Sequence, residues 1–282
     1  MHLFCFGLGY VAEAFARRLL ADGWRVSGTC RSEARFDKWR ELGVTAHVFD
    51  DGAPLLFPDD ALSEVTHVLH SVPPGESGDG VYASHADDLR RLPGLAWFGY
   101  LSTTGVYGDC GGARVDERSP TGATEPRAIR RIEAENTWLA SGLPVHVFRL
   151  SGIYGPGRNA LEKLRDGTAR RIIKPGQVFS RIHIDDITQA LCASVASPAP
   201  GEAYNVADDL PAASDEIIAY AAELLGVPLP DAVPFDDPSL PSMTRSFYGA
   251  CRRVANDKMK RELGVKLLYP DYKAGLRNLL NT

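Results

Sequence analysis

An α/β fold built on a doubly wound parallel sheet is predicted for this chain of 282 residues, on two observations. Short apolar runs rich in β-branched and aromatic residues alternate with helical patterns over the first 150 residues, which is typical of βαβ units. Beyond them, helical patterns are separated by Pro- and Gly-rich connections. We therefore expect a sheet domain over residues 1–155 and a small, interleaved C-terminal substrate lobe over residues 156–282.

The strands of the predicted sheet are short, and a helix follows most of them. The expected strands are 2–6, 25–30, 45–49, 66–71, 96–102 and 145–150. The helices expected between them are 10–21, 32–42, 80–91 and 124–141, and further helices are expected at 158–167, 185–196, 214–225 and 255–263. Gly43 and Gly142 mark two of the helix ends, because glycine readily adopts the left-handed backbone found there.

The composition is that of an ordinary globular protein and narrows the classes of partner. The net charge of −5 argues against nucleic acid or an anionic membrane as the main partner. No apolar run approaches the roughly 18 to 20 residues of a membrane-spanning helix, and Met1 leads into the first strand without a basic signal segment, so a cytoplasmic location is expected. The five cysteines are scattered without a C-x-x-C pair, which predicts reduced thiols.

The most informative motif is the run Gly7–Ala12 (GLGYVA), which joins the first predicted strand to the first predicted helix. Gly7 permits a tight turn, Gly9 lets backbone N–H groups approach a pyrophosphate, and Ala12 allows the helix to pack closely on the strand. The run therefore predicts a Rossmann-type dinucleotide site with the pyrophosphate at the helix N-terminus; the alternative is a plain βα turn. The residues expected around the cofactor are Gly7, Leu8, Gly9, Tyr10 and Val11.

The end of the second predicted strand favours NADP over NAD. An NAD site usually places a carboxylate about 20 residues after the glycines to bind the ribose hydroxyls, but this position carries Arg31 and Ser32 and no acid. A guanidinium can bind a 2′-phosphate through charge-assisted, bidentate hydrogen bonds. Arg31 could instead extend into solvent, and Asp50, after the third strand, could contact the adenine amino group or belong to a turn.

Loop clusters rich in Gly and Pro mark the candidate walls of the site. They cover residues 72–78, 108–121 and 228–241. Ligands of open α/β sheets bind where loops leave the carboxyl ends of the strands, so the first two clusters are candidate walls, and Ser71, Val72 and Pro73 are candidate cofactor contacts. The third is expected to form a surface or lid segment. Solvated turns are the alternative for the first two.

Five motifs span nearly the whole chain. They are Tyr100–Asp109 (YLSTTGVYGD), Arg149–Arg158 (RLSGIYGPGR), Ile182–Asp186 (IHIDD), Ala203–Val206 (AYNV), and Lys260–Gly264 (KRELG) followed by Tyr269 and Pro270. In this order they resemble the extended short-chain dehydrogenase/reductases, the NAD(P)-dependent epimerase and dehydratase superfamily. The resemblance implies a Rossmann domain, a small C-terminal substrate lobe and hydride chemistry on a nicotinamide.

The resemblance also implies roles for hydroxyl groups in these motifs. Thr103 corresponds to the catalytic Ser/Thr of the superfamily; a strand-end hydroxyl that bonds backbone is the alternative. Tyr107 is the nearest phenol that could donate a proton in catalysis, or else it packs in the loop wall. Ser102 and Ser151 are candidate cofactor contacts.

The chain departs from the superfamily in its Y-x-x-x-K pair. On the helix over 124–141, Arg127 stands where the Tyr is expected and Arg131 where the Lys is expected. A guanidinium cannot serve as proton donor and acceptor near neutral pH, so the usual acid/base pair is absent at these positions. Arg127 and Arg131 remain catalytic candidates, and they are expected to bind an anion or, for Arg131, the ribose side of the cofactor. The alternative is that Glu135, four residues on, neutralises Arg131 at the surface.

Two further departures concern the substrate. Gly152 and Phe179 stand where sugar-nucleotide enzymes of the superfamily usually carry Asn and Arg, so recognition of a nucleotide sugar is not expected. The sequence therefore favours an NADP-dependent oxidoreductase or epimerase-like enzyme acting on a small metabolite, with an anionic one indicated by the arginines. The alternative is a non-catalytic NADP-binding sensor or regulatory protein.

Metal sites and assembly complete the sequence-based expectations. His67 and His70 are three apart on a strand and so point to opposite faces, while Asp185 and Asp186 are typical of a helix start, so no metal is expected. The resemblance implies a homodimer formed by the helices 80–91 and 124–141. We expect it to be weak, because both helices are rich in arginine and like charges repel across a two-fold axis.

Overall fold

A computed structural model describes residues 1–50 and 53–281. The contacts within it divide the chain into two compact units. Unit 1 comprises Met1–Val106, Thr124–Arg149 and Thr188–Tyr204, and unit 2 comprises Tyr107–Ala123, Leu150–Ile187 and Asn205–Thr282. The division at residue 155 stays a prediction.

A seven-stranded sheet forms the centre of unit 1. Its strands are β1 (His2–Phe6), β2 (Arg25–Cys30), β3 (Thr45–Val48), β4 (His67–His70), β5 (Trp97–Thr103), β7 (Val145–Leu150) and β11 (Ala203–Val206). Their order is β11-β7-β5-β4-β1-β2-β3, and β1 pairs in parallel with both β2 and β4. The predicted doubly wound, Rossmann-type sheet is thus confirmed.

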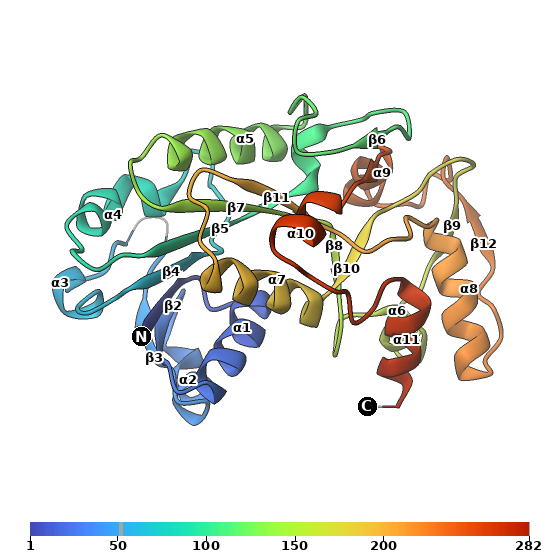
Figure 1. The fold of residues 1–282 in the computed structure, drawn as a ribbon. Helices are drawn as coiled ribbons and strands as arrows, with labels where there is room; N and C mark the ends of the chain where they lie inside the picture. The colour runs from blue at the N-terminus through green and yellow to red at the C-terminus, as the bar shows by residue number, and fades with distance from the viewer. Residues whose placement is uncertain (51–52, 282) are drawn as a thin grey trace. The chain divides into compact units, whose positions relative to one another are not determined.

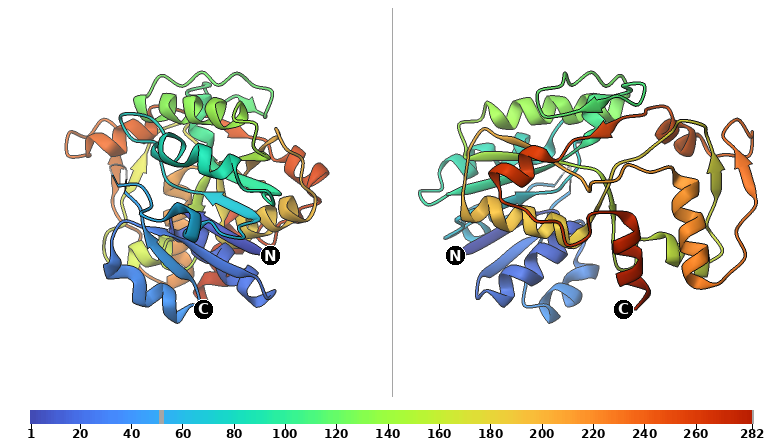
Figure 2. Two further views of the ribbon diagram at one scale, coloured as in Figure 1. Left: turned by 90° about the vertical axis from the view of Figure 1, so that its left-hand side faces the viewer. Right: turned by 45° about the vertical axis from the view of Figure 1, so that its right-hand side comes forward.

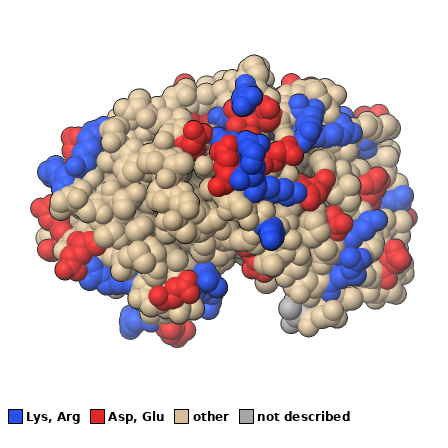
Figure 3. Space-filling model, viewed as in Figure 1, with Lys and Arg blue, Asp and Glu red and all other residues tan. Residues whose placement is uncertain are grey.

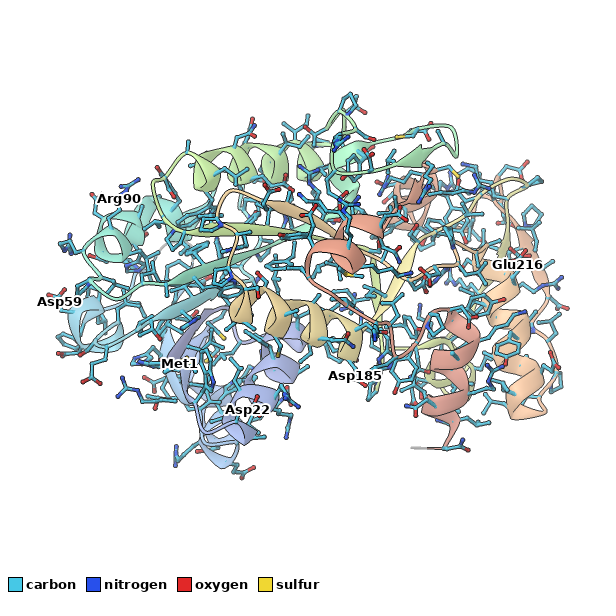
Figure 4. The ribbon with its side chains drawn as sticks, in the orientation of Figure 1. Met1, Asp22, Asp59, Arg90, Asp185 and Glu216 are labelled. Carbon is cyan, nitrogen blue, oxygen red and sulfur yellow. The ribbon has the colours of Figure 1, made fainter. Side chains whose placement is uncertain are left out.

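Helices cover both faces of this sheet. They are α1 (Tyr10–Ala21), α2 (Phe36–Glu41), α3 (Pro58–Ala61), α4 (Gly80–Arg90), α5 (Pro126–Leu139) and most of α7 (Ile184–Ala196), with the 3-10 turns η1 (Glu33–Arg35) and η2 (Thr104–Tyr107). Figures 1 and 2 show α4 and α5 on one face and α1 and α2 on the other. Figure 4 marks the ends of two of them, Arg90 on α4 and Asp22 after α1.

The spacing of apolar residues explains how α1 packs. Val11, Phe15 and Leu19 recur every four residues and are buried, so one face of the helix lies on the sheet. The helix ends at Ala21 with Asp22 as its C-cap, and Gly23 follows with a φ of +78°, a conformation that glycine adopts without strain. The opposite layer contains a buried cluster in which Trp138 of α5 packs 4.5 Å, between ring centroids, from Phe98 of β5.

Unit 2 is built from short elements. Its strands are β6 (Arg114–Val115), β8 (Gly152–Tyr154), β9 (Arg171–Ile173), β10 (Arg181–His183), β12 (Ala232–Pro234) and β13 (Arg253–Val254), and its helices include α6 (Ala160–Arg165), α8 (Ser214–Leu225), α9 (Ser242–Tyr248), α10 (Asp257–Glu262) and α11 (Tyr272–Leu280). The strands pair in parallel as β10-β8, β12-β9 and β13-β6. Leu161, Ile217 and Leu276, from α6, α8 and α11, belong to one buried core.

Two features of the structure bear on membranes and charged molecules as partners. None of the described helices is long and apolar enough to cross a membrane. On the face drawn in Figure 3, basic and acidic side chains are interspersed. The weak homodimer through α4 and α5 stays a prediction.

Candidate functional site

The turn after β1 has a backbone that only glycine fits. Gly7 has a φ of +89°, and a Cβ atom built on it would lie 2.8 Å from Ser71 Oγ and 3.0 Å from Val72 Cγ2. Its N–H donates to Thr29 Oγ1 at 2.9 Å, and the Leu8 N–H donates to the Thr29 carbonyl at 2.7 Å. The buried threonine of β2 therefore holds the turn in place, a role that the sequence pattern alone does not reveal.

The start of α1 is open in front of Gly9. Gly9 is the N-cap residue, with φ −104° and ψ −167°, and has no side chain to cap the helix. A Cβ atom built on it would meet nothing within 4 Å, whereas Ala12, one turn on, is fully buried. The N-terminus of α1, which begins at Tyr10 and Val11, thus has room for an anion beside the backbone.

The end of β4 is tied to the glycine turn. The Ser71 N–H donates to the Phe6 carbonyl at 2.8 Å, and its hydroxyl donates to the Gly7 carbonyl at 2.5 Å. Val72 is partly buried and Pro73 is exposed. Because the strand order reverses between β1 and β4, this is the crevice where open α/β sheets bind ligands.

Gly28 is a further residue on which the turn depends. A Cβ atom on it would lie 2.5 Å from the Cys5 carbonyl oxygen and 2.9 Å from Leu8 Cδ2. A larger residue would therefore separate β1 from β2 below the glycine turn. A glycine inside a strand pattern is the signal that could have identified it.

Two arginines are exposed just beyond β2. Arg31 is exposed and has no hydrogen bond or ion pair with the described residues, and Ser32 is the N-cap residue of η1. Arg35, also exposed, has its guanidinium 5.7 Å from the centroid of the Trp39 ring. Asp50 is exposed and exchanges backbone hydrogen bonds of 3.2 and 2.8 Å with Ala53, which favours the turn interpretation; residues 51 and 52 lie outside the described residues.

The end of β5 presents two hydroxyl groups. Ser102 is 5% exposed, and its Oγ has no hydrogen-bond partner among the described residues. Thr103 Oγ1 accepts a hydrogen bond from the Gly105 N–H at 3.0 Å, which leaves its hydroxyl hydrogen able to donate. The end of β5 thus carries two consecutive hydroxyl groups: that of Ser102, which has no described partner, and that of Thr103, which is partly buried.

Arg131 reaches from α5 to the same strand. Its Nη1 donates to the Leu101 carbonyl at 2.8 Å and to the Tyr100 hydroxyl at 3.3 Å. Burial raises the pKa of Tyr100 to about 12, although the Arg131 guanidinium opposes the shift. Tyr100 is fully buried, so its hydroxyl does not face a ligand at the surface of the site.

The alternative that Glu135 neutralises Arg131 at the surface is wrong. Glu135 is 2% exposed and forms an ion pair with Arg149, with Nη2 and Oε2 2.8 Å apart and two further contacts from Nε. Burial next to β7 therefore decides its partner, rather than the four-residue spacing along the helix. Arg127 is exposed near the start of α5.

Tyr107 and Ser151 belong to unit 2, whereas the other candidate residues belong to unit 1. Tyr107 is 2% exposed and its hydroxyl donates to Asn205 Oδ1 at 2.8 Å, which favours the loop-wall interpretation over proton donation. Ser151 is buried, and its Oγ has no partner in the described part of the chain. Neither role is tested by these contacts.

The histidines of β4 have structural partners. His70 is fully buried, with Nε2 2.8 Å from Asp79 Oδ2, and Trp138 Nε1 donates to the same oxygen. Burial opposes ionisation of Asp79, but His70 and these hydrogen bonds hold its pKa at about 2. Within residues 1–50 and 53–281, no group of three His, Cys, Asp or Glu side chains could hold a metal ion.

A solved structure from Silicibacter pomeroyi, described as a functionally unknown conserved protein, is 48% identical to the chain. The two superpose with a TM-score of 0.91 over 99% of this chain and 98% of that one. The chain belongs to the family of this protein. No protein-family model matches the chain.

More distant proteins carry names that describe an activity. A 3-diazoavenalumate denitrifying reductase of a Streptomyces species is 34% identical over 174 residues, which cover 57% of this chain and 55% of the reductase. A dTDP-glucose 4,6-dehydratase from Bacillus anthracis, solved in complex with NAD, has a TM-score of 0.81 at 17% identity over 100% of this chain and 96% of that one. The resemblance to the epimerase and dehydratase superfamily is thus confirmed for the fold. The replacement of the Tyr–Lys pair by Arg127 and Arg131 stays a prediction.

Proposed function

We propose that the chain is an NADP-dependent oxidoreductase of the epimerase/dehydratase type that acts on a small anionic metabolite without the usual Tyr–Lys pair. The observation that carries this proposal is the glycine turn. Gly7 has the positive φ and close contacts that exclude other residues, while the space in front of Gly9 is open. A cradle of this kind at the point of strand reversal fits a pyrophosphate.

The remaining contacts are assigned by their place on the sheet. Arg31 and Ser32, with Arg35 added from the structure, would hold the 2′-phosphate at the end of β2, and Ser71, Val72 and Pro73 would border the pyrophosphate. A bound nicotinamide dinucleotide would supply hydride transfer, which is consistent with a reductase among the relatives and with NAD in a structure of the same fold. Ser102, whose hydroxyl has no described partner, would donate to the ligand from the end of β5.

The proton source differs from that of the superfamily. Tyr107 donates its hydroxyl hydrogen to Asn205, and Tyr100 is fully buried, so neither phenol is available as it stands. Thr103 keeps a hydroxyl hydrogen beside Ser102 and would bind the oxygen of the substrate. The proton itself would come from solvent. After hydride transfer, water would protonate the negatively charged oxygen of the reduced substrate.

Turnover of the cofactor tests this function directly. The protein is incubated with reduced NADP and a panel of small carboxylates and phosphates, and the absorbance of the reduced nicotinamide is followed. We expect it to fall only with the correct substrate. Binding of the cofactor without any change in absorbance across the panel would instead support the second candidate.

The second candidate is a non-catalytic NADP-binding sensor. It is favoured by one specific observation, that the hydroxyls of Tyr100 and Tyr107 are both buried and engaged. A sensor needs the glycine cradle and Arg31 but no proton donor. A conformational response to NADP without turnover, detected by limited proteolysis, would distinguish it from the enzyme.

Replacing Arg31 with Ala is expected to weaken NADPH binding without affecting NADH. Loss of one charge-assisted contact with the 2′-phosphate costs about 1.5 to 3 kcal/mol, or roughly 10- to 150-fold in affinity. Calorimetric titration with both cofactors measures the change. Arg40→Ala, which removes an exposed arginine that pairs with Asp37 on α2, is the control. Equal affinity of the unmodified protein for NADPH and NADH would contradict the assignment.

Replacing Arg131 with Gln is expected to weaken cofactor binding roughly tenfold, because it removes a charged donor fixed at the end of β5. Arg127→Gln, in the exposed first turn of α5, is expected to lower only the thermal stabilisation by small anions. The control is Arg91→Gln, which removes an exposed arginine paired with Asp88 on α4. If both variants bind cofactor and anions as the unmodified protein does, the two arginines have no part in the site.

A further inference from the structure

Arg181 is a partly buried cation of unit 2 without an acidic partner. It begins β10, and its Nη1 donates to the carbonyls of Phe179 and Ala212 at 2.8 and 2.9 Å. These two residues form an isolated antiparallel bridge. No carboxylate lies within 4 Å of the guanidinium among the described residues, and Nε and Nη2 have no partner there. Neither Nε nor Nη2 is fully buried, so both remain in contact with solvent.

The surroundings of Arg181 are aromatic. Its guanidinium carbon is 5.8 Å from the centroid of the Phe179 ring, and Tyr154, Tyr248 and Tyr272, each at most 8% exposed, are close enough to influence it. Burial lowers the pKa of Arg181, although Asp208 and these tyrosines oppose the shift. Removing a charge from water without a counter-ion is costly, so an anion that paired with this guanidinium would be stabilised.

Asp208 is the acid with the strongest electrostatic influence on Arg181, and it does not form an ion pair with it. It is 1% exposed, and its Oδ1 accepts a hydrogen bond from the Leu210 N–H at 3.3 Å, while Oδ2 is buried without a described partner. Burial raises the pKa of Asp208 to about 8, with a contribution from Asp209 and Asp271 and against the influence of Arg181. The carboxyl group therefore holds its proton near neutral pH and leaves the charge of Arg181 uncompensated.

The two other acids near Asp208 are already engaged. Asp209 Oδ1 accepts hydrogen bonds from Asn256 Nδ2 at 2.7 Å and from the Lys260 ammonium. Asp271 caps α11, with Oδ1 accepting from the Ala274 N–H at 2.7 Å. Neither can turn to Arg181 without leaving a donor unsatisfied.

We propose that Arg181 is the anion-binding subsite of unit 2, where a carboxylate or a phosphate-type oxyanion of the substrate pairs with Nε and Nη2. This rests on the proposed function in that the anion belongs to the substrate. The residues of the subsite all belong to unit 2. Arg181 lies on β10, which pairs with β8 (Figure 1), and Asp208 lies in the loop after β11. Asp208 acts as a positioning residue whose neutral form keeps Arg181 available.

The test measures anion binding by the full chain without cofactor, so that it does not depend on turnover. Malonate represents a carboxylate and sulfate a phosphate-type oxyanion, and both keep their charge from pH 7 to 9. Thermal stabilisation gives the dissociation constant. We expect at least one of the two to bind and Arg181→Gln to weaken it by about tenfold to a hundredfold. The control is Arg165→Gln, since Arg165 is exposed and pairs with Glu162.

The pH dependence separates this role from a structural one. In the unmodified protein the affinity is expected to be constant below pH 7.5 and to fall up to tenfold by pH 9, as Asp208 loses its proton. Asp208→Asn keeps an acceptor for Leu210 and stays neutral, so its affinity should not change with pH. This arm remains decisive if Arg181→Gln fails to fold. Binding of neither anion, equal binding by Arg181→Gln and the control, or the same pH profile in Asp208→Asn would overturn the proposal.

Discussion

Gly9→Val is expected to weaken dinucleotide binding at least a hundredfold while leaving the fold intact. The valine side chain would occupy the open space at the N-cap of α1. It would keep phosphate oxygens out of hydrogen-bonding distance of the backbone N–H groups. A hundredfold loss corresponds to about 2.7 kcal/mol. Fluorescence titration with NADPH and NADH measures the affinity.

The stability of this variant is the necessary second measurement. The φ of −104° at Gly9 suits any residue, and valine at an N-cap costs no more than about 1 kcal/mol relative to glycine. Gly122→Val is the matched control, because a Cβ atom there also meets nothing within 4 Å and its φ is not in the left-handed range. Unchanged cofactor affinity in a stable Gly9→Val protein would exclude the glycine turn as the cofactor site.

Glu135→Gln is expected to lower the free energy of unfolding by about 3–5 kcal/mol. The substitution leaves the Arg149 guanidinium, whose side chain is 9% exposed, without its carboxylate in unit 1. Urea unfolding measures the loss. Glu162→Gln breaks an exposed ion pair with Arg165 and should cost less than about 1 kcal/mol.

A double variant tests whether the loss arises from the missing carboxylate beside Arg149. Glu135→Gln combined with Arg149→Met removes both charges and should recover most of the lost stability, because an apolar replacement of a buried ion pair is often nearly neutral. If the double variant is as unstable as the sum of the two single ones, packing rather than charge explains the effect.

The central sheet could be predicted from sequence because most of its strands are buried, largely apolar runs. Residues 2–6, 25–30 and 145–150 were predicted and observed with the same bounds, since apolar and β-branched residues at both faces leave few other structures open. The strands of unit 2 have two or three residues each. Such segments are too short to show an alternation of apolar and polar residues. Each pairs with a strand that lies far away in the sequence.

The site was predictable where backbone geometry required a particular residue. Gly7 and Gly9 have distinct reasons to be glycine, which the sequence context indicates. The partner of Glu135 was not predictable, because helix spacing favours Arg131 and only the buried position of Arg149 on β7 overrides it. Arg181 was missed for a similar reason: an arginine two residues before His183 becomes notable only when Asp208 is seen to lie nearby without pairing with it.

The order in which the chain is synthesised gives the seven-stranded sheet a vulnerable stage. β7 is complete at residue 150, but its outer neighbour β11 begins only at residue 203. All six residues of β7 are buried in the finished protein, and four of them are apolar. Until β11 emerges, the outer backbone edge of this strand is unpaired and able to bond with other chains. At roughly 5–20 residues per second the interval lasts several seconds. Ribosome pausing within it should therefore favour aggregation, and chaperones that cover strand edges should be most effective on nascent chains of this length.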